Sequence, residues 1–280
     1  MACSSASTVA QAGELCSADG RARARLVFSD PPFNVKINGH VGGLGKTKHA
    51  EFAMATGEMS KAEFTGFLET AFRNAADVSM DGAIHYQCMD WRHVEEMMKA
   101  GSAVYSELKN ICIWSKDNAG MGSFYRSQHE LVFVWKVGSA PHLNTVELGK
   151  NGRYRTNIWN YRGATKTGAD AELAMHPTVK PVPMIMDAIR DTSKTGDIVL
   201  DPFGGSGSTL IAAEKTKRLG RLVEYEPGYC EVTIRRWQTL TRKPPVLEAT
   251  GESFNEVSAR RVATMEDAAD AALTASAADD

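Results

Sequence analysis

The chain has 280 residues, 43% of them hydrophobic and 24% charged, and its formal net charge at pH 7 is −2. These values are typical of globular proteins, and the length allows one large α/β domain with small additions. No apolar run is long enough to span a membrane, and the N-terminus does not read as a secretion signal. The five cysteines form no C-x-x-C pair, which argues against a zinc knuckle or a disulfide scaffold and favours reduced thiols in a cytoplasm.

The two ends of the chain differ in composition from the middle. Residues 1–20 are rich in Ala and Ser, and residues 256–280 are Ala-rich and acidic. We expect disorder at 1–20 and a disordered tail at 256–280, with a frayed helix as the alternative for the tail, at the two ends of a domain at 21–255. Apolar patterning between the ends predicts strands that alternate with helices, which favours a doubly wound, mainly parallel α/β sheet with helices on both faces. The strands are predicted at 26–30, 83–88, 111–115, 130–135, 197–201, 221–226 and 245–249. The helices are predicted at 60–79, 91–100, 181–193, 207–217 and 228–240.

The tetrapeptide Asp30-Pro31-Pro32-Phe33 ends the first predicted strand. Each proline lacks an N–H and has a fixed φ, so the chain must leave the sheet as a stiff, extended turn. The turn holds a carboxylate, the Pro31 carbonyl and an aromatic ring together. These groups suit a flat heterocycle with an amino group, which would stack on Phe33 and donate hydrogen bonds to Asp30 and to the carbonyl. On these residues alone, a plain strand-ending turn is an equal alternative.

A glycine-rich turn at 204–207 joins the apolar run 197–201 to a predicted helix. Glycines let a ligand approach the backbone closely, and the helix N-terminus favours negative groups. The turn matches neither the Walker A nor the G-x-G-x-x-G pattern. Glu224 and Glu226 end the next predicted strand, where an acid can bind both ribose hydroxyls. Together these features indicate an adenosine-type ligand, while a solvated strand end is the alternative for the two acids.

Four segments of the sequence resemble one known family. D-P-P-F at 30–33 and F-G-G-S-G at 203–207 are similar to the catalytic and cofactor motifs of the amino-group DNA methyltransferases, which use S-adenosylmethionine. H-P-T-V-K-P at 176–181 and F-Y-R-S-Q-H-E at 124–130 are similar to two further segments of that family. The catalytic motif comes first, which is the circularly permuted order of the β group of adenine-N6 and cytosine-N4 enzymes. The likeness spans residues 25–240.

The resemblance implies a Rossmann-like sheet in which 26–30 and 197–201 are neighbours, so that Asp30 and the glycine turn face one cleft. It also implies S-adenosylmethionine as the cofactor and no metal ion. The expected catalytic residues are Asp30, Pro31, Pro32 and Phe33. The residues expected to bind the cofactor are Asp201, Phe203, Gly204, Gly205, Ser206, Gly207, Thr209, Glu224, Glu226, His176, Thr178 and Lys180.

The resemblance further implies that the target base is flipped out of a DNA duplex and stacks on Phe33. We expect sequence recognition in the insert at 137–175, where basic and aromatic residues are interleaved, and closure over DNA by the Gly-rich basic loop at 35–49. The residues expected to contact DNA are Asn34, Lys36, Lys46, Lys48, Arg126, Arg153, Arg155 and Arg162. A turn-stabilising role for Asn34 and a surface salt bridge for Arg126 stay open as alternatives.

The sequence therefore predicts an adenine-N6 DNA methyltransferase that acts on double-stranded DNA. Adenine is preferred because cytosine-N4 members of the family more often carry Ser in place of Asp30. Cytosine-N4 methylation is the nearest alternative, followed by a catalytically silent cofactor- or DNA-binding module and by a protein-glutamine or RNA methyltransferase. The recognition sequence, a possible homodimer and any restriction endonuclease partner are left open.

Overall fold

The computed structural model describes residues 22–35, 55, 57–120, 124–150, 152–163 and 179–261. The disorder expected at 1–20 and beyond 261 lies outside the described residues. The helices and strands in chain order are β1 (Ala24–Ser29), α1 (Lys61–Asp77), β2 (Ser79–Met89), η2 (Trp91–His93), α2 (Val94–Val104), β3 (Glu107–Ser115), β4 (His129–Lys136), η3 (Glu147–Gly149), β5 (Ile158–Asn160), α4 (Val182–Thr192), β6 (Ile198–Asp201), α5 (Ser208–Lys215), β7 (Leu219–Leu222) and α6 (Pro227–Thr241).

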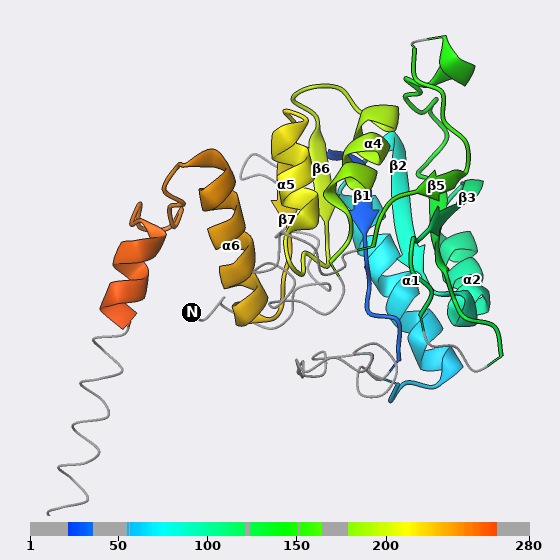
Figure 1. The fold of residues 1–280 in the computed structure, drawn as a ribbon, viewed down its shortest axis with the longest axis horizontal. Coiled ribbons are helices and arrows are strands. Elements are labelled where there is room, and N and C mark those ends of the chain that lie inside the picture. Colours follow the sequence, from blue (N-terminus) through cyan, green and yellow to red (C-terminus); the bar gives the residue numbers. More distant parts are fainter. Residues whose placement is uncertain are drawn as a thin grey trace, which may run out of the picture.

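The strands form one sheet in the order β5-β3-β4-β2-β1-β6-β7 (Figure 1). β1 lies inside the sheet and pairs in parallel with β2 on one side and with β6 on the other. The β6–β7 and β3–β5 pairs are also parallel, whereas β4 is antiparallel to β2 and β3. Strand order therefore reverses between β1 and β6, which is where doubly wound sheets bind ligands. The predicted Rossmann-like, mainly parallel sheet is confirmed.

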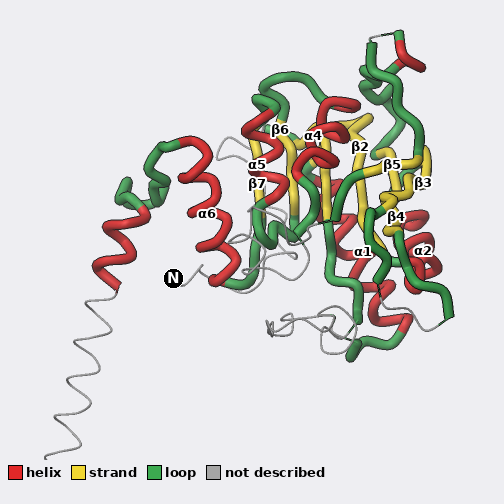
Figure 2. The backbone as a smooth tube through the Cα atoms, in the orientation of Figure 1, coloured by secondary structure: helices red, strands yellow, loops and turns green. Residues whose placement is uncertain are grey.

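Two apolar cores cover the two faces of this sheet, because successive side chains of a strand point to opposite faces. One core packs α4 and α5 against Leu26 and Phe28 of β1. The other packs α1 and α2 against Phe133 and Trp135 of β4. The resulting helix–sheet–helix layers are visible in the tube view, where helices flank the strands (Figure 2). No helix in the described ranges is long and apolar enough to cross a membrane.

The sheet is shorter at β7 than the sequence predicts. β7 ends at Leu222 instead of 226, because the next residue, Val223, turns back toward the glycine-rich segment. Its N–H donates to the carbonyl of Asp201, and its carbonyl accepts from the N–H of Gly204. The strand predicted at 245–249 contributes only an isolated bridge and is not part of the sheet.

The chain beyond α6 is ordered further than expected. Residues 254–261 are helical, and Phe254 and Val257 in this helix are buried. The guanidinium of Arg235 on α6 lies 5.3 Å from the centre of the Phe254 ring, which holds the two helices together. The predicted boundary at 255 therefore falls inside a helix instead of marking the start of a disordered tail.

Candidate active site

The acid-proline motif and the glycine-rich segment meet at one edge of the sheet. Asp30 directly follows β1, and Asp201 ends β6. The two strands are paired in parallel register, with Leu26 opposite Val199 and Val27 opposite Leu200. Parallel neighbours end at the same edge, so the two motifs are brought together as the sequence predicts.

An ammonium group lies directly against the Asp30 carboxylate. The Nζ atom of Lys180 donates to Oδ2 of Asp30 at 2.6 Å and lies 2.8 Å from Oε1 of Glu130. The other carboxylate oxygen of Glu130 accepts from Nζ of Lys116 at 3.1 Å. Oδ1 of Asp30 is buried and has no hydrogen-bond partner among the described residues. A buried acceptor without a donor is costly, so this oxygen is available to a ligand that brings an N–H group.

The two carboxylates of this cluster differ in their acidity. Burial raises the pKa of Asp30 to about 6, even though the Lys180 ammonium opposes the shift. Burial acts on Glu130 in the same direction, but two ammonium groups outweigh it and hold the pKa of Glu130 below its ordinary value. Asp30 therefore titrates near neutral pH, whereas Glu130 stays ionised.

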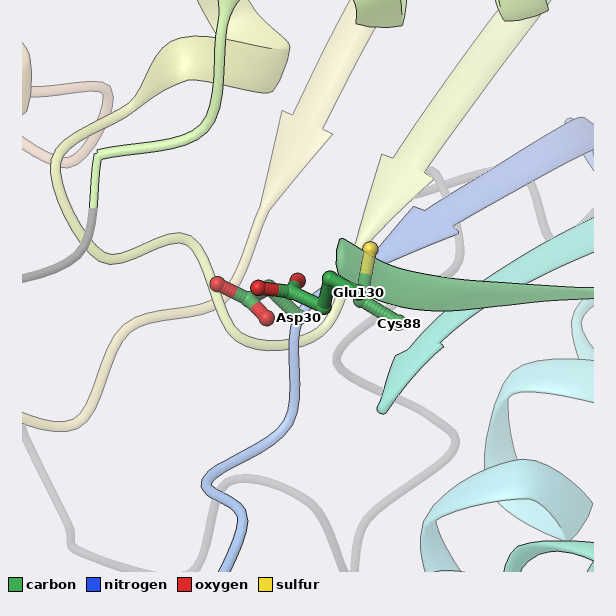
Figure 3. Close-up of side chains that lie close together, drawn as sticks. All are labelled: Asp30, Cys88 and Glu130. Atoms are coloured by element: carbon green, nitrogen blue, oxygen red, sulfur yellow. The ribbon is translucent and has the colours of Figure 1, made fainter. Parts of the chain in front are cut away.

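The thiol of Cys88, at the end of β2, completes the cluster. One ligand atom from each of Asp30, Cys88 and Glu130 lies within 4.8 Å of the others, and Figure 3 shows the three side chains converging. This grouping could not be predicted from the sequence, since the three residues come from three distant segments of the chain. The cation among them is the ammonium of Lys180, which pairs with both carboxylates. Burial also raises the pKa of the Cys88 thiol well above its ordinary value, so the sulfur stays protonated.

Phe33 and Asn34 continue the turn after the two prolines. The Phe33 ring is partly buried against both cores, and the Lys180 ammonium lies 5.2 Å from its centre. The Asn34 side chain donates to the carbonyl of Met59 at 2.8 Å and accepts from the N–H groups of Gly57 and Met59. Its backbone is left-handed, with a φ of 53°. These bonds support the turn-stabilising alternative for Asn34 over the expected DNA contact.

The glycine-rich segment at 204–207 forms a tight bend before α5. The N–H of Gly207 donates to the carbonyl of Gly204 at 2.8 Å, and φ of Gly207 is +77°. A Cβ on Gly207 would lie 2.7 Å from the Thr233 side chain of α6, so only glycine fits there without displacement. Thr233 also donates to the Gly205 carbonyl at 3.0 Å, and the buried guanidinium of Arg236 donates to the carbonyl of Ser206. Helix α6 thus holds the bend from behind.

The side chains of Asp201 and Thr209 bond to each other across the bend. Thr209 Oγ1 donates to Oδ2 of Asp201 at 2.6 Å, and the N–H of Phe203 donates to Oδ1 at 3.0 Å. Both oxygens of Asp201 are therefore used within the bend. The Phe203 ring packs 5.9 Å from that of Phe67 on α1. These contacts give Asp201, Phe203 and Thr209 a role in shaping the bend.

The two acids after β7 lie in different environments. Glu224 is half-buried, and its carboxylate accepts from the N–H of Gly205 at 2.6 Å and from that of Glu226 at 2.8 Å. Glu226 is exposed. Glu224 is consequently the acid that the fold places beside the glycine bend, at the position where doubly wound folds hold a ribose.

The arginines expected to contact DNA are mostly engaged within the protein. Arg153 and Arg155 of the insert form ion pairs with Asp191 on α4, at 2.7 and 3.2 Å. They attach the insert to the domain and do not present free charge. Arg126 donates to the carbonyls of Ala119 and Gly120 in its own loop, which replaces the surface salt bridge considered as its alternative.

Arg162 is the exception among these arginines. It is exposed, and the described part of the chain offers it no ion pair. The remaining candidates fall outside the described residues: Lys36, Lys46, Lys48, His176 and Thr178. Lys180, which the resemblance assigns to cofactor binding, lies with its ammonium against Asp30.

Sequence reasoning missed Glu130, Lys116 and Cys88 as parts of the site. Glu130 belongs to the segment 124–130, whose resemblance to the family was noticed without a role for the acid. A charged residue that begins a buried apolar strand is itself a signal, because burial of a carboxylate requires a partner. Lys116 and Cys88 carry no such signal.

Comparison with known proteins identifies the family. Residues 24–235 match the N6/N4 family described as DNA methylase, and the chain belongs to this family. M2.LlaDCHI, a type II methyltransferase of Lactococcus lactis subsp. cremoris, is 32% identical over 75% of this chain and 81% of its own length. M2.MboI of Moraxella bovis, also a type II methyltransferase, is 29% identical over 51% of this chain, and the match covers only 53% of that relative.

Solved structures share the fold. The M1.HpyAVI–S-adenosylmethionine complex has a TM-score of 0.55 at 18% identity and covers 78% of this chain and 91% of its own. PvuII DNA methyltransferase, which is cytosine-N4-specific, has a TM-score of 0.57 at 15% identity, with coverage of 78% and 81%. The family is the one that the four sequence motifs indicated, and its methyl donor is S-adenosylmethionine.

Proposed function

We propose that this protein transfers a methyl group from S-adenosylmethionine to the N6 amine of an adenine in DNA. The observation that carries the proposal is the buried Oδ1 of Asp30, which has no partner in the described part of the chain and lies at the same sheet edge as the glycine bend. An exocyclic amine supplies the N–H donor that this oxygen lacks. The family membership gives the reaction class, and the geometry of Asp30 gives the amine a place to bind.

The residues present fit the cofactor and the base. The bend at 204–207 and Glu224 would hold S-adenosylmethionine, whose sulfonium supplies an activated methyl group. Asp30 and the carbonyl of Pro31 would accept hydrogen bonds from the amine, which favours a tetrahedral nitrogen with a localised lone pair. The carboxylate also stabilises the positive charge that develops on this nitrogen. Holding both reactants in line at one sheet edge supplies a further part of the rate enhancement.

The base must leave the duplex to reach Asp30, and we infer that Phe33 stacks on it. Two further aromatic rings belong to the loop between β3 and β4. Phe124 and Tyr125 are 87% and 82% exposed, with their ring centres 4.5 Å apart. The same loop leads into Glu130, and we infer that these exposed rings contact bases next to the flipped one.

The direct test identifies the methylated nucleoside. Purified protein, mixed DNA duplexes and labelled S-adenosylmethionine are incubated, and the DNA is digested to nucleosides for mass analysis. N6-methyladenine is the expected product. Asp30→Ala should lower the rate by at least about 10²-fold, because it removes an acceptor aimed at developing charge, while cofactor binding stays near wild type.

The other outcomes of this test are distinct. N4-methylcytosine as the product would overturn the choice of adenine and keep the reaction class. Binding of cofactor or DNA without any transferred label would indicate a silent binding module. Lys109→Met is the matched control, since this lysine lies on β3 and pairs only with surface acid Glu107 among the described residues.

A further inference from the structure

We infer that Lys180 and Glu130 are positioning residues for Asp30, and that they turn one oxygen of its carboxylate toward the target amine while they hold the other. The inference rests on the proposed function, because it assigns a task to groups around its reacting carboxylate. It replaces the cofactor contact that the sequence suggested for Lys180.

The geometry separates the two oxygens of Asp30. Oδ2 is fixed by the Lys180 ammonium at 2.6 Å, whereas Oδ1 is left buried and without a partner among the described residues. Lys180 is in turn fixed by Glu130 at 2.8 Å, and Glu130 by Lys116 at 3.1 Å. Through these contacts, residues on β4 and in the segment before α4 hold the Asp30 carboxylate in one orientation.

The ammonium of Lys180 is held for this task from several directions. Its side chain is only 7% exposed, and it lies 5.2 Å from the centre of the Phe33 ring and 5.9 Å from that of Trp114. Two carboxylates and two aromatic faces surround it. A lysine enclosed in this way has little freedom to reach a cofactor, and its shortest contact is the one with Asp30.

The charges that face Asp30 can be named for each neighbouring element. β2 contributes the neutral thiol of Cys88, and β4 contributes the anion of Glu130. The segment after β3 contributes the cation of Lys116, and the segment before α4 that of Lys180. Asp201 of β6, whose pKa burial raises to about 8, is mainly protonated at neutral pH. The cation of Lys180 favours the ionised form of Asp30, and the anion of Glu130 opposes it.

Because Lys180 and Glu130 act oppositely on the ionisation of Asp30, the pH dependence of the methylation rate tests the inference. The rate of methyl transfer at saturating DNA and S-adenosylmethionine should fall on the acid side near pH 6, where Asp30 becomes protonated. Lys180→Met should move this acid limb upward by about 1–3 pH units, so that activity lost at pH 7 returns at pH 9. Glu130→Gln should move the limb downward, toward the ordinary aspartate value of about 4.

Three further measurements complete the test. Lys180→Arg retains the cation and should keep the limb closer to that of wild type than Lys180→Met does. Lys109→Met should leave the profile unchanged. The affinity for S-adenosylmethionine, measured by calorimetry, should change less than threefold in Lys180→Met. Glu130→Gln keeps the shape of the side chain, so it carries the inference even if Lys180→Met does not fold.

Failure of the inference and failure of the proposed function give different results. If wild type methylates DNA but both variants keep the limb near pH 6, Lys180 and Glu130 do not act through Asp30. A tenfold or larger loss of cofactor affinity in Lys180→Met, with an unmoved limb, would restore the cofactor role of Lys180. If wild type transfers no label at any pH, the proposed function itself fails.

Discussion

Two aspartates at the ends of neighbouring strands, Asp30 and Asp201, differ in role because their hydrogen-bond partners differ. Asp201 accepts bonds at both oxygens, from Thr209 and from the N–H of Phe203, and is closed to a ligand. One oxygen of Asp30 is held by Lys180, and the other has no partner among the residues that the structure describes. Both are predicted site residues in the sequence, but only the bonding pattern tells the residue that shapes the bend from the one that we propose binds the substrate.

Asp201 should lower the stability of the fold as the pH rises. Burial raises its pKa to about 8, with smaller contributions from the charges of Asp30 and Glu224. The unfolded value is about 3.9, so between about pH 4 and pH 8 the folded state binds more protons, and the free energy of unfolding falls as the pH increases. Asp201→Asn removes this titration.

Urea unfolding at pH 5, 6.5 and 8 checks the prediction. The stability of Asp201→Asn relative to wild type should increase steadily across this range. A difference that is the same at all three pH values would show that Asp201 is already ionised in the folded protein.

At the scale of elements, helix α6 determines the shape of the glycine bend. Thr233 and Arg236 reach the carbonyls of Gly205 and Ser206 from behind, and Thr233 fills the space where a Cβ at Gly207 would lie. The helix follows the bend by some twenty residues in sequence. The conformation of the bend therefore depends on its contacts with α6 as well as on its own glycines.

Gly207→Ala should destabilise the protein more than Gly196→Ala, although both glycines have a positive φ. Gly196 also has a positive φ, +86°, but a Cβ there meets nothing within 4 Å. Gly196→Ala should cost about 1 kcal/mol from backbone strain. Gly207→Ala should cost about 2–4 kcal/mol, because the clash with Thr233 adds to that strain. Thermal or urea unfolding measures both, and Thr233→Ala in the Gly207→Ala background should recover part of the loss; equal costs for the two glycines would contradict the bracing by α6.

Sequence patterns predicted the elements whose signal is local. The buried strand before Asp30 and the strand before the glycine bend were found because apolar runs end there in proline or glycine. β5 was missed, since a three-residue strand has no periodicity. The ion cluster could not be derived at all. Asp30, Glu130 and Lys180 are distant in sequence, and they meet only because β1 and β4 lie on either side of β2 and the segment before α4 passes beside them.

The ion pairs of the insert at 137–175 could not be predicted from the sequence either. Basic residues interleaved with aromatics favoured DNA contact at Arg153 and Arg155, but a sequence does not reveal which cations have acids within reach. Asp191, on α4, lies close to both and binds them. Composition therefore overestimated the positive charge that this part of the surface can offer to phosphate groups.

At the scale of the whole molecule, a formal net charge of −2 must be reconciled with the polyanionic substrate that we propose. Attraction to DNA then depends on particular surface cations and not on the overall field. Many of the described cations are paired, as the ion pairs of Arg153, Arg155 and Lys180 show. The salt dependence of binding consequently reports a small set of side chains.

Arg162 and Arg153 should behave differently in that measurement. The slope of log K against log salt concentration should become shallower by about 1 in Arg162→Gln, as expected for one lost phosphate contact. Arg153→Gln should leave the slope unchanged and instead lower the melting temperature, because it leaves Asp191 short of a partner. DNA binding titrations between 50 and 200 mM salt check both; a shallower slope in Arg153→Gln alone would reverse the assignment.

The buried thiol of Cys88 can serve as a probe of local opening in the protein. It is fully enclosed beside Asp30 and Glu130, and it stays in its unreactive thiol form. An alkylating agent can reach this sulfur only after the surrounding structure opens. The rate at which Cys88 is labelled therefore reports the rate of local opening around Asp30.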